Sequence, residues 1–332
     1  MRALIVIGGP TASGKSSLAL SLAEGLGGVV VNADSMQLYR DLRVLTARPT
    51  PEEEARAPHR LYGVLDAAEV SAAGRWLELA RVELEAIWQE ARVAIVVGGT
   101  GLYLHALLHG IAPVPDIPDE VRAATRALGR RLGAPGLHAE LARIDPEMAA
   151  RLQPGDRQRV MRAHEVVVAT GRSLAAWQQE PSARIALPER RLGLALLPPR
   201  PALHARIEAR LRAMVAAGAL EEVRALAARR LAPDLPVMKA VGVGPLLAHL
   251  EGRLEREAAI DAALVQTRQF AKRQLTWLRH RLAELRPVAA FGDDPTHAPD
   301  PDALRRVLLT AVPSPPSVHC TKESDHADGL LP

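Results

Sequence analysis

Residues 9–16, Gly-Pro-Thr-Ala-Ser-Gly-Lys-Ser, constrain the fold of this 332-residue chain more than any other stretch. They match the pattern G-x-x-x-x-G-K-[ST], in which backbone N–H groups surround phosphate oxygens, the lysine adds positive charge and the last hydroxyl can bind Mg²⁺. An apolar run at residues 4–7 precedes the pattern, and helical spacing follows it as far as Leu26. This context predicts a phosphate-binding loop between a buried strand and a helix.

Further apolar runs at residues 29–31 and 93–97 alternate with helical patterns, of which residues 75–91 are the clearest. Such alternation predicts right-handed βαβ units and a parallel sheet covered by helices on both faces. We therefore expect an α/β fold, a P-loop-containing parallel sheet flanked by helices. The later expected elements are a strand at 191–197, helices at 202–230 and 256–285, and a short strand at 288–291.

The character of the sequence changes after Pro113, Pro115 and Pro118. Helical periodicity runs from there to about residue 180, and a strand pattern then returns. This order predicts a helical insertion domain at residues 118–189, with residues 1–117 and 190–310 forming the P-loop core domain. The tail at 311–332 lacks apolar periodicity, so we expect it to be disordered.

Composition limits the class of protein. Hydrophobic residues make up 48% of the chain, which is ample for a core. The single cysteine, Cys320, excludes an internal disulfide and a cysteine-based metal site. No run reaches the roughly 18 apolar residues that span a bilayer. We expect a cytoplasmic protein with no membrane association, and a monomer, since no pattern indicates a dimer seam.

Positive charge is concentrated in the middle of the chain. Residues 111–290 carry 29 Lys and Arg against 19 Asp and Glu, whereas residues 1–110 carry 10 against 12. Such a basic region favours a polyanionic partner larger than a nucleotide. Arginines on solvated helix faces are the alternative explanation.

Two polar residues follow the second and third strands. Ligands of parallel sheets bind at the carboxyl ends of the strands, where this chain places Asp34 and Thr100. An aspartate there can accept a proton from an attacking group, and a threonine can donate a hydrogen bond to a departing phosphate oxygen. Alternatively, Asp34 caps a helix and Thr100 is an ordinary turn residue.

Several stretches beyond the loop resemble the tRNA dimethylallyltransferases, also called tRNA isopentenyltransferases. The distinctive stretches are NADSMQLY at 32–39, GGTGLY at 98–103, GDRQRVMRAHEV at 155–166, HARIEARLRAM at 204–214 and AKRQLTWLR at 271–279. The resemblance is collinear over about residues 3–290. It implies transfer of a dimethylallyl group from dimethylallyl diphosphate to N6 of the adenine 3′-adjacent to the tRNA anticodon.

The resemblance also implies roles for individual residues. Asp34 would be the general base, and Thr100 would stabilise the bridging oxygen of the leaving group. Diphosphate contacts would come, with Mg²⁺ on Ser16, from Gly9, Thr11, Ala12, Ser13, Gly14, Lys15, Ser16, Arg206 and Arg210. Contacts with the tRNA anticodon stem-loop would come from Asp34, Ser35, Met36, Gln37, Arg122, Gln158, Arg159 and Arg162.

Helical geometry adds a further candidate surface for RNA. On a helix over 256–285, a basic stripe of Arg268, Lys272, Arg279 and Arg286 would border an apolar seam. With the resemblance, we expect tRNA contacts from Arg268, Lys272 and Arg279. One stretch departs from the family, since Val243-Gly244 replaces a common Tyr-Arg pair and removes a ring and a charge.

Three alternative functions are compatible with parts of the sequence. A P-loop small-molecule kinase would bind nucleotide and use ATP at the loop, but it leaves the basic helix without a role. A non-catalytic RNA-binding protein would not need Lys15, Ser16 and Asp34. A prenyltransferase acting on free adenylate would not need the basic middle region.

Overall fold

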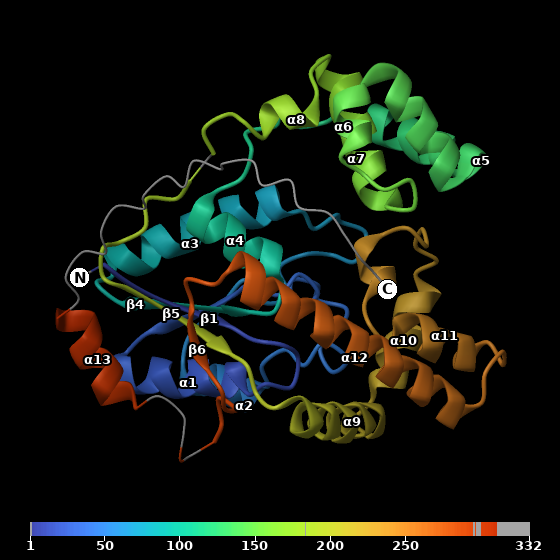
Figure 1. The fold of residues 1–332 in the computed structure, drawn as a ribbon. Helices are drawn as coiled ribbons and strands as arrows, with labels where there is room; N and C mark the ends of the chain where they lie inside the picture. The colour runs from blue at the N-terminus through green and yellow to red at the C-terminus, as the bar shows by residue number, and fades with distance from the viewer. Residues whose placement is uncertain (1, 183, 295, 297–299, 311–332) are drawn as a thin grey trace.

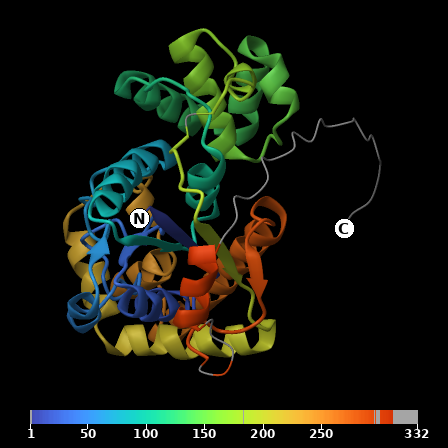
Figure 2. The same cartoon turned by 90° about the vertical axis from the view of Figure 1, so that its left-hand side faces the viewer.

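A parallel sheet with helices on both faces forms the larger part of the protein, and a separate group of helices stands apart from it (Figures 1 and 2). The computed structural model describes residues 2–182, 184–294, 296 and 300–310. The tail expected to be disordered, 311–332, lies outside the described residues.

Every strand pair in the sheet is parallel, and the order is β3-β2-β4-β1-β5-β6. The strands are β1 (Ala3–Gly8), β2 (Val29–Asn32), β3 (His59–Arg60), β4 (Val93–Gly98), β5 (Arg191–Leu196) and β6 (Arg286–Val288). Strands β1 and β4 are buried along their whole length. The expected α/β class with a parallel sheet is confirmed.

Two hydrophobic cores lie on the two faces of this sheet. Successive side chains of a strand point to opposite faces, so Leu4 and Val6 enter one core and Ile5 and Ile7 the other. The helices of this larger part are α1 (Lys15–Leu26), α2 (Pro51–Arg56), α3 (Ala73–Gln89), α4 (Gly101–His109), α9 (Arg200–Ala216), α10 (Ala219–Ala228), α11 (Val243–Leu250), α12 (Arg256–Arg281) and α13 (Pro301–Thr310). A short 3-10 helix, η1 (Pro236–Lys239), precedes α11.

The separate group of helices has its own hydrophobic core. It contains α5 (Asp119–Ile144), α6 (Pro146–Ala150), α7 (Arg157–Thr170) and α8 (Leu174–Trp177). Leu137, Leu141 and Val160 are fully buried within it. An ion pair of 3.6 Å between Arg126 Nη1 of α5 and Asp234 Oδ2 links the group to the sheet-containing part.

Some expected elements differ from those observed. The region 202–230 contains two helices rather than one, because Gly218 adopts a left-handed conformation with φ of 107° between them. The last strand lies at 286–288 rather than 288–291. Helix α12 ends at Arg281, so Arg286 belongs to β6 and not to a helical basic stripe.

Within the described part of the chain, no helix is both long enough and apolar enough to cross a membrane.

Candidate active site

The phosphate-binding loop joins β1 to α1 at the carboxyl edge of the sheet. Gly14 precedes α1 with a φ of 78°, a left-handed conformation that favours glycine. Within the loop the hydroxyl of Ser13 is fully buried and has no hydrogen-bond partner. A buried hydroxyl without a partner is costly, and a phosphate oxygen is a suitable acceptor for it.

Lys15 lies buried at the start of α1 and its Nζ donates to the carbonyl oxygen of Pro10 at 3.3 Å. Burial lowers the pKa of Lys15 from 10.5 to about 8. The carboxylate of Asp34 opposes this shift, and the guanidinium of Arg210 adds to it. Lys15, Asp34 and Arg210 therefore act on one another at the same site.

The backbone of Asp34 is fixed by the side chain of Asn32, at the end of β2. Asn32 Oδ1 accepts from the Asp34 N–H at 2.8 Å, and its Nδ2 donates to the Asp34 carbonyl at 2.9 Å. The Asp34 carboxylate accepts from the N–H of Met36 at 3.0 Å. Residues 35–38 form turns, so Asp34 is not a helix N-cap.

Thr100 follows β4 and faces the same turn. Its Oγ1 accepts a hydrogen bond from the N–H of Ser35 at 2.9 Å, and its own N–H donates to the carbonyl of Ala33 at 3.2 Å. This approach needs Gly98, because a Cβ there would overlap the backbone of Ala33. Strands β4 and β2 thus bring Thr100 next to Asp34 at one edge of the sheet, where the sequence predicts both residues.

A cavity of about 360 Å³ lies next to the phosphate loop and Asp34. Thr11 and Ala12 of the loop, together with Asp34, Ser35 and Met36, form part of its lining. Helix α9 contributes Ile207, Arg210, Leu211 and Met214, and helix α12 contributes Thr267, Phe270 and Arg273. Gln158 lines it from α7, so the cavity extends to the separate group of helices.

Gln274 of α12 ties together three segments of the site and was not anticipated from the sequence. Its Oε1 accepts from the N–H of Thr11 at 2.9 Å, and its Nε2 donates to the carbonyl of Gly99 at 2.9 Å. The side chain is 4% exposed. One signal of this role was present in the sequence: Gln274 is a polar residue next to the apolar seam of Ala271, Leu275 and Leu278.

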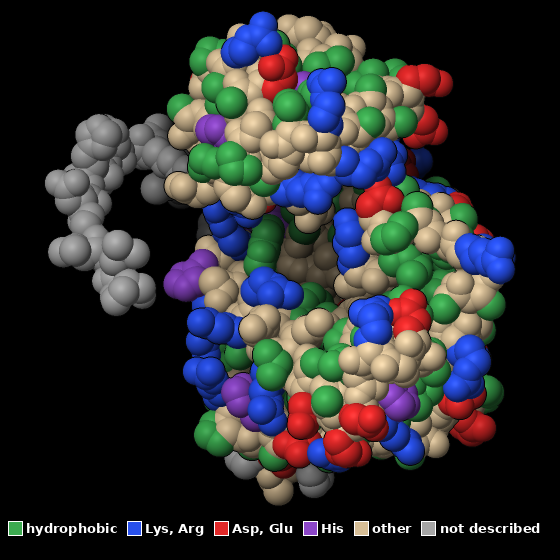
Figure 3. All heavy atoms as spheres, turned by 90° about the vertical axis from the view of Figure 1, so that its right-hand side faces the viewer, with side chains coloured by type: hydrophobic (Ala, Val, Ile, Leu, Met, Phe, Trp, Pro, Cys, Tyr) green, Lys and Arg blue, Asp and Glu red, His purple; other side chains and the backbone are tan. Residues whose placement is uncertain are grey.

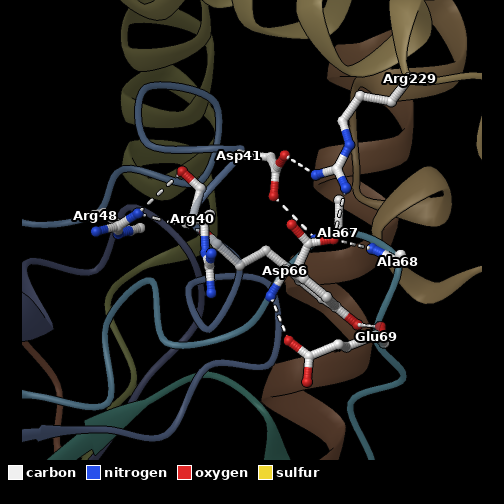
Figure 4. Close-up of polar contacts among 9 residues, drawn as sticks. Arg40, Asp41, Arg48, Asp66, Ala67, Ala68, Glu69 and Arg229 are labelled. Carbon is white, nitrogen blue, oxygen red and sulfur yellow. Dashed lines mark hydrogen bonds and ion pairs between the residues drawn. The ribbon is translucent and has the colours of Figure 1, made fainter.

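Helix α10 holds in place the segment whose residues Leu45 and Thr46 line the cavity. The carboxylate of Glu222 accepts from the backbone N–H groups of Arg43, Val44 and Leu45 at 2.7–2.9 Å. Nearby, the guanidinium of Arg229 lies between the carboxylates of Asp41 and Asp66, the latter at 2.6 Å (Figure 4). These contacts fix the segment after Asp34 against α10.

The two arginines expected to contact diphosphate occupy different positions. Arg210 lines the cavity, and burial lowers its pKa. Arg206, one turn earlier, is paired with Asp293 and its guanidinium lies 4.3 Å from the ring centroid of Phe291. It is therefore beside the loop but outside the lining of the cavity.

The residues expected to contact RNA are distributed over both parts of the protein. Gln158 lines the cavity, whereas Arg159 is exposed beside Asp156 at 3.3 Å. Burial lowers the pKa of Arg162, and the guanidinium of Arg122 adds to this effect. Gln37 is buried, and its amide donates to the carbonyls of residues 46 and 47, so it does not line the cavity.

The basic residues of α12 face more than one direction. Arg268 pairs with Glu208 of α9 at 3.2 Å, while Lys272 and Arg279 line a second pocket of about 310 Å³ with Arg200 and His204. Lys239 and Arg273 line the first cavity and were missed by the helical-stripe argument. Figure 3 shows a hollow between the two parts of the protein with Lys and Arg side chains around its rim.

The departure at Val243-Gly244 lies at the start of α11. Val243 is buried, and Gly244 is exposed with open space around its Cα. The neighbouring Lys239, Ala240 and Val241 line the cavity. The residue pair is therefore next to the site, and a longer side chain at position 244 would fit.

No group of three or more His, Cys, Asp or Glu suited to a metal ion occurs among the residues with described positions. The loop itself fits a magnesium diphosphate, since the orphan Ser13 hydroxyl is available to a phosphate oxygen and Ser16 is exposed on the first turn of α1. Mg²⁺ usually takes only one or two protein ligands at such sites and completes its shell with phosphate oxygens and water.

Comparisons with known proteins agree on one family. The IPP transferase family matches residues 37–281. The chain is 57% identical to a tRNA dimethylallyltransferase of Rhodospirillum centenum, over 86% of this chain and 91% of that protein. It is 54% identical to one of Rhodopseudomonas palustris, over 86% and 89%.

Solved structures give the same result. A full-length tRNA isopentenylpyrophosphate transferase of Bacillus halodurans is 31% identical, with a TM-score of 0.64 over 93% of this chain and 95% of that one. A eukaryotic dimethylallyltransferase, described as acting on tRNA, is 25% identical with a TM-score of 0.73 over 93% and 84%.

Proposed function

This chain belongs to the IPP transferase family, and we propose that it transfers the dimethylallyl group of dimethylallyl diphosphate to an adenine of tRNA, releasing diphosphate. The acceptor atom is N6 of the adenine 3′-adjacent to the anticodon. The relatives named tRNA dimethylallyltransferase match the chain over most of its length. The observation that carries the proposal is that Asp34 lines one cavity with residues of the phosphate loop, while the bond from the Ser35 N–H holds Thr100 beside Asp34.

The chemistry needs a proton acceptor and a stabilised leaving group. The exocyclic amine of adenine is a weak nucleophile, because its lone pair is delocalised into the ring. Asp34 accepts the amine proton as the new C–N bond forms, and the C–O bond to diphosphate breaks. Asn32 fixes the backbone of Asp34, which keeps the carboxylate at the mouth of the loop.

The leaving diphosphate takes up negative charge at the loop. The backbone of Gly9, Ala12 and Gly14, the hydroxyls of Thr11 and Ser13 and the ammonium of Lys15 bind its oxygens. Thr100 donates to the bridging oxygen, and Arg210 lines the cavity from α9. Mg²⁺, bound through Ser16 and the diphosphate, would supply further charge neutralisation.

The apolar part of the cavity suits the five-carbon group. Ile207, Leu211 and Met214 of α9 line it together with Phe270 of α12. A hydrophobic wall excludes water from an electron-poor allylic carbon and reduces hydrolysis. The cavity therefore combines an anion site with a small apolar compartment.

RNA binding is assigned to both parts of the protein. The target base must leave the anticodon-loop stack, which costs a few kcal/mol and is cheapest in a single-stranded loop. Ser35 and Met36 line the cavity that would receive the base, and Gln158 lines the same cavity from α7. Six basic residues provide positive charge for the backbone of the anticodon stem-loop: Arg122, Arg159, Arg162, Arg268, Lys272 and Arg279.

The proposed division into domains follows from the same arrangement. Residues 118–189 form the insertion that contacts tRNA, and residues 1–117 with 190–310 form the core that binds dimethylallyl diphosphate. We further propose that the protein acts as a monomer in the cytoplasm.

The first test mixes the protein, Mg²⁺ and labelled dimethylallyl diphosphate with a tRNA that carries adenine 3′ of its anticodon. Label should enter this tRNA and not one in which that adenine is replaced. A parallel reaction with labelled ATP and one with free AMP test the kinase and the adenylate prenyltransferase. Turnover of ATP without transfer to tRNA would refute the proposed activity.

A further inference from the structure

The segment after β6 crosses the phosphate loop. The N–H of Gly292 donates to the carbonyl of Ser13 at 2.9 Å. A Cβ on Gly14 would lie 2.6 Å from Asp293 Oδ1 and 2.8 Å from the Gly292 nitrogen. The carboxylate of Asp293 is therefore in direct contact with the loop, although 279 positions separate Asp293 from Gly14 in the sequence.

The same segment fixes the guanidinium of Arg206 on two sides. Arg206 Nη1 donates to Asp293 Oδ1 at 2.7 Å, and its Nη2 donates to Oδ2, so the pair is bidentate. The ring of Phe291 lies against the guanidinium, with 4.3 Å between the ring centroid and Cζ. A bidentate carboxylate and a stacked ring together restrict a side chain that otherwise has many rotamers.

The pair leaves donors of Arg206 available. A guanidinium has five N–H groups, and Asp293 takes one from each terminal nitrogen. Three N–H groups remain for another anion. Burial lowers the pKa of the neighbouring Arg210, and the guanidinium of Arg206 adds to this effect, while Arg210 itself lines the cavity with Thr11 and Asp34.

We propose that Asp293 is a positioning residue that holds Arg206 ready for the diphosphate at the loop. The inference rests on the proposed function, in which diphosphate is the group bound there. Holding the guanidinium in place before the ligand arrives reduces the rotamer entropy lost on binding. Asp293 acts through Arg206, and it does not itself contact the diphosphate.

The electrostatic state of the pair suits this role. The guanidinium of Arg206 lowers the pKa of Asp293, so the carboxylate is ionised at neutral pH. The carboxylate in turn raises the pKa of Arg206. Both partners keep their charges, and the pair persists across the pH range in which the transfer would be measured.

A double-mutant cycle tests the proposal. The affinity for inorganic diphosphate with Mg²⁺ is measured by calorimetry for the wild type, Asp293→Ala, Arg206→Ala and the double variant. We expect Asp293→Ala to weaken binding about 5- to 20-fold, which corresponds to one or two immobilised side chains. In the Arg206→Ala background, Asp293→Ala should have less than a twofold effect.

Two results would overturn the proposal. The first is unchanged diphosphate affinity in Asp293→Ala. The second is an equal loss with and without Arg206, which would mean that Asp293 acts only by packing on Gly14. Asp302→Ala, at an exposed carboxylate of α13, serves as the matched control and should bind diphosphate as the wild type does.

Steady-state kinetics provide a second readout. Asp293→Ala should raise the KM for dimethylallyl diphosphate and leave the KM for tRNA unchanged, whereas a general loss of structure would alter both. Failure of the proposed function is seen separately, because it abolishes transfer in the wild type while leaving the binding cycle measurable.

Discussion

Thr100 Oγ1 accepts a hydrogen bond from the backbone N–H of Ser35 at 2.9 Å, and so connects the end of β4 to the turn that follows β2. The bond places Thr100 beside Asp34, which immediately precedes Ser35 in the chain. It uses one lone pair of the hydroxyl oxygen and leaves the proton free for an acceptor. In this structure Thr100 Oγ1 donates that proton to the hydroxyl oxygen of Ser35 at 3.3 Å, an acceptor that a diphosphate oxygen would replace.

Thr100→Val tests the role of this proton. Valine keeps the shape but removes both the donor and the acceptor of the Ser35 N–H, so kcat should fall by at least the roughly 10²- to 10³-fold that the loss of one oxyanion donor costs. Thr100→Ser should keep activity within tenfold. The measurement is single-turnover transfer to tRNA, with the melting temperature as control. Equal kcat in Thr100→Val and the wild type would exclude the proposed role.

Gln274→Leu removes both bonds between α12 and the strand-end turns. The carbonyl of Gly99 loses its partner in a buried place and the N–H of Thr11 in a half-buried one, at a cost of roughly 1–3 kcal/mol. We expect kcat/KM for dimethylallyl diphosphate to fall 10- to 100-fold. Gln274→Glu keeps only the acceptor oxygen, and its kcat/KM should lie between those of the wild type and Gln274→Leu. Full activity in Gln274→Leu would show that the loop holds its shape unaided.

The affinity for diphosphate should depend on the protonation of Lys15. Its pKa is lowered by burial to about 8, so the free protein loses this charge as the pH rises through 8. The affinity of the wild type is divided by that of Lys15→Met at each pH, which removes the titration of diphosphate itself. This ratio should be constant below pH 8 and fall up to tenfold per pH unit above it. A difference curve that is flat to pH 10 would contradict the shift.

The same shift predicts a trend in stability. Between pH 8 and 10.5 the unfolded chain holds a proton on Lys15 that the folded chain lacks, so the free energy of unfolding rises with pH across this window. Lys15→Met should be more stable than the wild type at pH 7, by up to about 3 kcal/mol. Urea unfolding at pH 7 and pH 10 should show this difference narrowing.

Glu222→Gln tests how α10 holds the segment at 43–45. The carboxylate accepts three backbone N–H groups, and an amide supplies only one acceptor oxygen. We expect a loss of about 1–3 kcal/mol in the free energy of unfolding and a higher KM for tRNA. Glu221→Gln, at the neighbouring exposed carboxylate, is the control. Identical behaviour of the two variants would argue against the role of Glu222.

Gly244→Arg tests the consequence of the departure from the common Tyr-Arg pair. Position 244 has open space, and an arginine there adds one charge next to the cavity. The affinity for tRNA should increase, and the slope of log affinity against log salt should steepen by about one unit. Gly244→Gln is the neutral control. A slope that does not change would place RNA away from α11.

The strands that build the site were predictable because burial leaves a strong signal in the sequence. Strands β1 and β4 are uninterrupted apolar runs, and the polar residues after them mark the edge where ligands bind. Strand β3 escaped prediction because it has two residues, His59 and Arg60, and forms only by pairing with β2. Gly218 divides a helical pattern through its backbone conformation, which periodicity does not report.

The loop, Asp34 and Thr100 were predictable because each lies within two residues of the end of a buried strand. Gln274 and Glu222 were not, because their partners are backbone groups 175 to 263 positions away. Such a contact leaves no local pattern. Arg206 was expected at the diphosphate by resemblance, but its pairing with Asp293 depends on how the chain returns to the loop after β6.

The separate hydrophobic core of helices α5–α8 has an evolutionary consequence. Side chains such as Leu137 and Val160 pack among themselves and share no core cluster with the sheet. Substitutions that reshape this group of helices leave the packing behind the phosphate loop undisturbed. On the proposed function, selection can therefore change which RNAs this group of helices recognises without repacking the core behind the phosphate loop.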